Sequence, residues 1–140
     1  DAAEAALRRA VAAHPREAEA QYALALALAR QGRAADALGP IAQAATLRPE
    51  EPRYAYVHAI ALNQLRRTEE AVAVLRMNLD RHPRHRDSLM GLATIERDRA
   101  NFAEAERLAA AAAGLNPSDR EAAALLSQVR GLRQRVPGLR

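Results

Sequence analysis

One stretch of the sequence decides the fold: residues 18–51 read AEAQYALALALARQGRAADALGPIAQAATLRPEE. Its first half places apolar side chains at Leu24, Ala25 and Leu28, the spacing of one face of a helix. Gly32 follows, and glycine readily takes the left-handed conformation that ends a helix. The first half of the stretch therefore predicts a helix that ends just before this glycine.

The second half of the stretch predicts another helix. Ala37, Ile41 and Ala44 recur at the spacing of a helical face, and the two alanines are small enough to let the helices approach closely. Pro49 then stops the helix, because proline lacks the N–H that the next turn would need. One unit is thus a helix, a tight turn, a second helix and a proline stop.

This unit recurs every 34 residues along the whole chain. Two columns mark the period, Pro15, Pro49, Pro83 and Pro117, and Ala3, Ala37, Ala71 and Ala105. The recurrence predicts helices over about 2–13, 18–31, 35–47, 52–65, 69–81, 86–99, 103–114 and 119–134.

The composition agrees with an all-α protein and excludes several classes of function. Alanine, leucine, arginine and glutamate dominate, whereas aromatic residues make up only 3% of the 140 residues. The chain has no cysteine, which excludes disulfides, thiolate metal sites and haem attachment through cysteine within it. The net charge is +4, and every basic residue is an arginine interspersed with acids. We expect a soluble protein without a membrane span.

The column set resembles the tetratricopeptide repeat (TPR) family, whose 34-residue unit has a Leu-small-x-x-large run, an alanine, a large residue and a closing proline. The resemblance implies an all-α solenoid of about eight helices, in which antiparallel helix pairs stack into a right-handed superhelix. It implies one array over residues 1–135, with a flexible tail at 136–140. The array divides into a half repeat at 1–17, full repeats at 18–51, 52–85 and 86–119, and a terminal helix at 120–135. Because the first helix lacks its partner, we expect the segment to come from a longer chain.

A second, weaker resemblance covers residues 52–99 and is to TPR arrays attached to bacterial multihaem cytochrome-type proteins. It rests on the run Arg53 to Ala59 and on Arg84-His85-Arg86-Asp87. It implies a bacterial protein and leaves the compartment open between cytoplasm and periplasm.

Several residues depart from the repeat pattern. The bulky aromatic that the family carries early in each first helix is missing, and Tyr54 is the candidate to replace one such residue. His58 occupies a leucine column, so we expect it to be buried and held by a hydrogen bond, with Asn78 as the candidate partner; the alternative is a polar relay or pH switch. Glu96 and Arg130 occupy another leucine column, and we expect both to reach solvent from a loosened end of the array.

Gly39 and Pro40 fall inside the second helix of the first full repeat. An interior proline costs around 3 kcal/mol relative to alanine. We therefore expect either a bend in this helix at Pro40 or a helix start so late that Pro40 lies in its first turn.

No arrangement of residues supports catalysis. The sequence has no Ser-His-Asp set, no glycine-rich phosphate loop and no HExxH motif, so we expect a protein that is not an enzyme and carries no cofactor. His82 and His85 flank Pro83 in a basic turn, but two histidines lack the further ligands of a structural metal site. A solvated basic turn is the simpler interpretation, and no metal is expected.

The outer face of each first helix is the candidate binding surface. If the family geometry holds, these faces line the concave side of the array, where apolar side chains on an open surface mark a binding site. The predicted groove residues are Tyr22, Leu26, Arg30, Arg53, Tyr56, Val57, Ile60, Asn63, Met90, Thr94 and Arg97.

The sequence thus predicts a non-catalytic scaffold that binds a peptide or helix of a protein partner in this groove. The first alternative is self-association through the terminal helices, with Leu125, Leu126, Val129 and Leu132 sealing against another copy. The second is an accessory domain of a larger protein whose activity lies outside this segment. Nucleic acid is disfavoured, because repeats that read bases need polar residues at the recurring positions that are largely apolar here.

Overall fold

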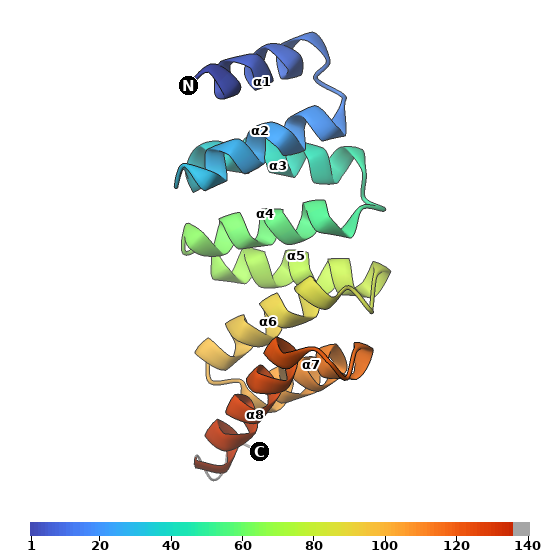
Figure 1. Ribbon diagram of the computed structural model, residues 1–140. Helices are drawn as coiled ribbons and strands as arrows, with labels where there is room; N and C mark the ends of the chain where they lie inside the picture. Colours follow the sequence, from blue (N-terminus) through green and yellow to red (C-terminus); the bar gives the residue numbers. More distant parts are fainter. Residues whose placement is uncertain (136–140) are drawn as a thin grey trace. The chain divides into compact units, whose positions relative to one another are not determined.

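The computed structural model describes residues 1–135, which form eight helices and no strand (Figure 1). Their bounds agree with the predicted helices to within one residue at each end, so the all-α prediction is confirmed. The expected tail at 136–140 lies outside the described residues. The helices are α1 (Ala2–Ala13), α2 (Ala18–Arg30), α3 (Ala34–Leu47), α4 (Pro52–Gln64), α5 (Thr68–Arg81), α6 (Arg86–Asp98), α7 (Phe102–Leu115) and α8 (Arg120–Arg135).

The chain forms two compact units, Asp1–Val74 and Leu75–Arg140, and the boundary falls within α5. In the first unit, α1 packs on α2, α2 on α3 and α3 on α4. In the second unit, α6 packs on α7 and α7 on α8. Each unit is therefore built of consecutive helices joined by short turns, as the repeat predicts, whereas one array over 1–135 stays a prediction.

Small residues lie where paired helices meet. Ala25, Ala59 and Ala93 share one column of the repeat and have no exposed surface. Ala71 and Ala105, from the facing column, are equally buried. Because alanine occupies so little volume, the helix axes approach closely and the neighbouring leucines fill the remaining space.

The turn inside each repeat has the same backbone geometry. Gly32, Arg66 and Ala100 stand 34 residues apart, and all three have positive φ angles, of 74°, 62° and 63°. In each turn the next amide donates across the helix end, for example from Arg33 N to Leu28 O at 2.9 Å. This is the Schellman ending of a helix. Only the first repeat places glycine at this left-handed position. In the other two turns Arg66 and Ala100 adopt a backbone conformation that residues with a side chain disfavour.

Pro40 lies in the interior of α3. The helix runs without a break from Ala34 to Leu47, and Pro40 is its seventh residue, so the alternative that placed it in the first turn is wrong. A bend at this position stays a prediction. Ala37, Ile41 and Ala44, on either side of the proline, are all buried. We infer that this packing stabilises helical geometry that the proline alone would disfavour.

Tyr54, the candidate to replace the missing family aromatic, lies in the core. It is buried in α4 and packs with Ala18 and Ala44, while Leu47 and Tyr22 contact the same cluster. That Tyr54 replaces the family's aromatic side chain stays a prediction, which its burial supports.

Candidate functional site

The predicted groove residues of the first unit lie on two helices, α2 and α4. We call the outward side of these helices the α2–α4 face. Leu26 and Ile60 are half-buried, which leaves part of each aliphatic side chain in contact with solvent. Tyr22 and Tyr56, one turn earlier on each helix, are also half-buried. The remaining members of the face are Arg30, Arg53, Val57 and Asn63.

An aromatic contact connects the two helices of this face. The rings of Tyr22 and Tyr54 have their centroids 4.6 Å apart and are tilted by 37°. Such tilted pairs stabilise by about 0.5–1.5 kcal/mol beyond the area they bury. Tyr22 also packs against the core cluster of α2 and α3. It is therefore a structural residue as well as a candidate contact, a role that the sequence analysis did not assign to it.

Two other predicted groove residues have partners within the fold. Val57 packs against the core cluster that contains Leu28 and Ile41. The Asn63 side-chain oxygen accepts a hydrogen bond from the Thr68 hydroxyl at 2.8 Å, which connects the end of α4 to the start of α5. These two residues position the α2–α4 face more than they extend it.

Charged side chains mark opposite ends of the face. Arg30 is the last residue of α2, and Arg53 is the second residue of α4, which runs in the same direction. Both arginine residues are exposed. The middle of the α2–α4 face is thus apolar and an exposed arginine stands at each end, with the acidic Glu19 of α2 at the same repeat position as Arg53.

The predicted groove residues of the second unit do not form a comparable apolar surface. Met90 is buried, and the Thr94 hydroxyl donates to the Met90 carbonyl at 2.9 Å. The Arg97 guanidinium donates to the Gln128 side-chain oxygen at 2.8 Å and pairs with Asp98. Thr94, at the repeat position of Leu26 and Ile60, thus carries a hydroxyl bonded within α6, and the Arg97–Gln128 bond joins α6 to α8.

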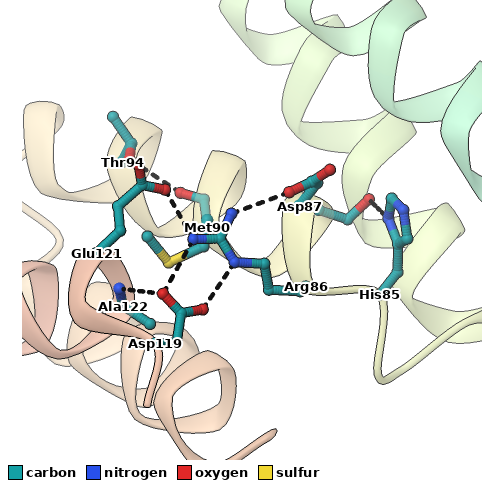
Figure 2. Close-up of polar contacts among 9 residues, drawn as sticks. His85, Arg86, Asp87, Met90, Thr94, Asp119, Glu121 and Ala122 are labelled. Carbon is teal, nitrogen blue, oxygen red and sulfur yellow. Dashed lines mark hydrogen bonds and ion pairs between the residues drawn. The ribbon is translucent and has the colours of Figure 1, made fainter. Parts of the chain in front are cut away.

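Figure 2 shows a charged network at the start of α6 that the sequence analysis missed. Arg86 donates to both carboxylate oxygens of Asp119, at 2.8 and 3.2 Å, and to Glu121 at 2.8 Å. It also bonds Asp87 at 3.0 Å. Asp119 and Glu121 lie 33 and 35 residues beyond Arg86, close to one repeat period. That spacing is the signal that could have revealed the network.

The network shifts the ionisation of its members. Hydrogen bonds from Arg86 and from the Ala122 amide lower the pKa of Asp119 to about 2. The same carboxylates, Asp119 first, raise the pKa of Arg86. Because Asp119 also accepts from the Ala122 amide at 3.1 Å, it stabilises the first turn of α8.

Contrary to the prediction, Glu96 does not reach solvent. Its side chain is only 4% exposed, and its two oxygens pair with Arg76 at 3.0 Å and with Arg99 at 3.3 Å. The expectation failed because two arginines satisfy the buried carboxylate where it lies. Arg130, in the same column, does reach solvent with 57% of its side chain exposed, beside Glu106 at 3.6 Å.

The histidines make local interactions. His58 is half-buried rather than enclosed, so the imidazole keeps contact with water. Burial and, to a smaller extent, Arg67 lower its pKa, while Glu70 opposes them. The predicted bond from His58 to Asn78 stays a prediction. Asn78 donates to the buried Ser88 hydroxyl at 2.9 Å.

His85, in the basic turn, pairs with a hydroxyl. Its Nδ1 lies 2.8 Å from the Ser88 hydroxyl oxygen. Among residues 1–135, no group of three or more histidine, cysteine or acidic side chains is placed to hold a metal ion. Within the same range, no helix is long and apolar enough to cross a membrane.

Family models match most of the chain. A model described as "Anaphase-promoting complex, cyclosome, subunit 3" matches residues 1–78, and one described as "Tetratricopeptide repeat" matches residues 56–120. The chain belongs to the tetratricopeptide repeat family. TPR repeats generally serve protein–protein interaction, and scaffolds of this kind are generally non-catalytic.

Solved TPR structures share the fold at low sequence identity. A crystal structure of MamA matches with a TM-score of 0.83 and 16% identity, over 94% of this chain and 78% of that one. The Arabidopsis OM64 TPR domain matches with a TM-score of 0.75 and 16% identity, over 81% and 94%. A TPR protein from Parabacteroides merdae matches with a TM-score of 0.79 and 20% identity, over 96% and 59%. No curated protein matches the chain by sequence.

Proposed function

We propose that the α2–α4 face binds an apolar segment, extended or helical, of a protein partner. The observation that carries the proposal is the half-buried state of Leu26 and Ile60 on helices joined by the Tyr22–Tyr54 contact. Side chains held in this way lose little conformational freedom when a ligand covers them, so most of the gain from burial goes into affinity.

The expected gain in binding free energy follows from the side-chain area that Leu26 and Ile60 leave exposed. Full burial of a leucine or isoleucine side chain stabilises by about 1.5–3 kcal/mol, and Leu26 and Ile60 are already mostly buried, so covering the part that remains exposed gives about 0.5 kcal/mol each. A variant that lacks both aliphatic side chains should lose about 1 kcal/mol of binding free energy. That loss corresponds to binding roughly fivefold weaker.

The test uses peptides selected against this protein. A random peptide library displayed on phage is panned on the full chain, and enriched peptides are titrated by calorimetry. We expect Leu26→Ser/Ile60→Ser to bind roughly fivefold more weakly. Met77→Ser is the matched control, because Met77 is 62% exposed on α5 and lies off the face. No enrichment, or equal affinity for the double variant and the control, would contradict the proposal.

Self-association through α8 has less support. Leu125 and Val129 are already buried, and both lie in α8, which packs on α7. Only Leu126 and Leu132 of the predicted set remain half-buried. Light scattering at two concentrations tests this alternative, which predicts a mass that rises with concentration.

A further inference from the structure

A depression on the first unit lies away from the α2–α4 face. Its volume is about 560 Å³, and it is formed by the turn between α1 and α2 together with the end of α3. The lining residues are Ala13, His14, Pro15, Arg16, Glu17, Ala18, Leu47 and Arg48. Three of these side chains are basic or can become cationic, and one is acidic.

The repeat explains why the basic side chains meet. His14 and Arg48 stand 34 residues apart, and each follows its helix with the same backbone bond, to Ala10 and to Ala44 respectively. Equivalent residues of successive repeats therefore lie side by side at this edge of the unit. Arg16 adds a second guanidinium from the same turn as His14.

Within the described part of the chain, no acid pairs with the guanidinium groups of Arg16 and Arg48. Arg16 and Arg48 are exposed and make no ion pair with any residue in 1–135, whereas Arg33 in the same unit pairs with both Glu4 and Asp36. Glu17 is the single acid in the lining. With two arginines and one glutamate, the depression carries a local charge of about +1.

The depression is also lined by apolar residues of a core cluster. Ala18 belongs to the buried cluster with Ala44 and Tyr54, and Leu47 packs against that cluster. The Gln21 side chain donates to the Pro15 carbonyl at 3.0 Å, which fixes the turn that carries Arg16. Arginine side chains on such a support can bind an oxyanion through paired N–H donors.

We propose that this depression binds a single oxyanion group, a carboxylate or a phosphoryl group. The site is distinct from the α2–α4 face, and the proposal does not rest on peptide binding there. An anion could arrive as a free ion or on an acidic side chain of a peptide, and both present the same chemistry to Arg16 and Arg48.

The test is an NMR titration of the full chain at constant ionic strength. Sodium phosphate, sodium acetate and a blocked tetraglutamate peptide are each added against matched sodium chloride. We expect saturable shifts of the Arg16 and Arg48 side-chain Nε–H signals and of the Glu17 amide with at least one of these probes. Saturation by phosphate alone assigns a phosphoryl group, and saturation by acetate assigns a carboxylate. Tighter binding of the peptide than of acetate assigns a peptide-borne source.

Variants decide whether the shifts report this site. Arg16→Gln/Arg48→Gln should weaken binding at least tenfold. Arg66→Gln should leave it unchanged, because Arg66 is exposed on a turn at the other end of its helices and also has no ion pair within the described residues. Circular dichroism of each variant checks that the fold is retained. Shifts that grow linearly with every salt, match those from chloride, or persist in the double variant would overturn the proposal.

Discussion

Replacing Glu96 with leucine should stabilise the protein. The equivalent residues in the two preceding repeats are Leu28 and Leu62, both buried, so the column accepts an aliphatic side chain. Glu96 holds its charge there by pairing with Arg76 and Arg99, whose side chains are 46% and 33% exposed. We therefore compare what the ion pairs contribute with what the buried carboxylate costs.

The magnitudes favour leucine. Pairs whose arginine remains in contact with water contribute about 0–1 kcal/mol each. Removing a carboxylate from water costs several kcal/mol, and well-packed apolar replacements of buried ion pairs are often neutral or stabilising by about 1–4 kcal/mol. We expect Glu96→Leu to raise the free energy of unfolding by about 1 kcal/mol. Glu96→Ala should lie about 2–5 kcal/mol below Glu96→Leu, because it leaves a cavity.

Urea unfolding followed by circular dichroism measures these differences. If the slope against urea is unchanged, a shift in midpoint reports stability directly. Leucine should move the midpoint above that of the parent protein, and alanine should move it below. A leucine variant as unstable as the alanine variant would refute the reasoning, since it would mean that the paired carboxylate, and not the volume, is what this position needs.

Three further predictions address single side chains. Tyr22→Ala should lower the free energy of unfolding by about 2 kcal/mol in urea melts, because its ring packs on Tyr54 and two core clusters, whereas Tyr22→Phe should retain most of it. Ala100→Gly should raise stability by about 1 kcal/mol, visible as a higher melting temperature, because Ala100 holds a φ of 63° that glycine adopts without strain. Asp119 has a pKa of about 2, below its ordinary 3.8, so its stabilising contribution is present above about pH 4 and is lost as the pH falls toward 2. Asp119→Asn should therefore flatten the urea midpoint against pH over that window, and an unchanged profile would count against the Arg86 network.

The fold could be predicted because the repeat fixes both helix spacing and helix ends. Four prolines at a constant interval set the period, and the buried alanine columns identify the faces that meet. The position of a residue in the repeat could not reveal how a departure from the pattern, such as Glu96 in a leucine column, is packed. Glu96 stays buried because Arg76 of α5 and Arg99 of the turn after α6 pair with its carboxylate. Arg76 is distant from Glu96 in sequence, and Arg99 belongs to a different column of the repeat, so the column of Glu96 does not reveal either partner.

The candidate site was predicted less completely. The period identified which residues share the outer face of α2 and α4, and Leu26 and Ile60 lie there half-buried. The repeat period could not distinguish side chains that stay exposed from those that pack against the core, such as Val57. It also treated the second unit as equivalent, although Arg97 bonds Gln128 there. Those differences arise from side-chain pairs across repeats, which a column pattern does not encode.

The isoleucine methyl groups give the most direct test of the α2–α4 face as a binding surface. The chain has three isoleucines, and Ile41 and Ile95 are buried while Ile60 is half-buried on the face. In protein labelled at the isoleucine δ1 methyl groups, irradiation of a bound, selected peptide should transfer saturation to Ile60 and leave Ile41 and Ile95 nearly unchanged. Saturation that reaches Ile95 while Ile60 is silent would contradict the account and place the ligand on the second unit.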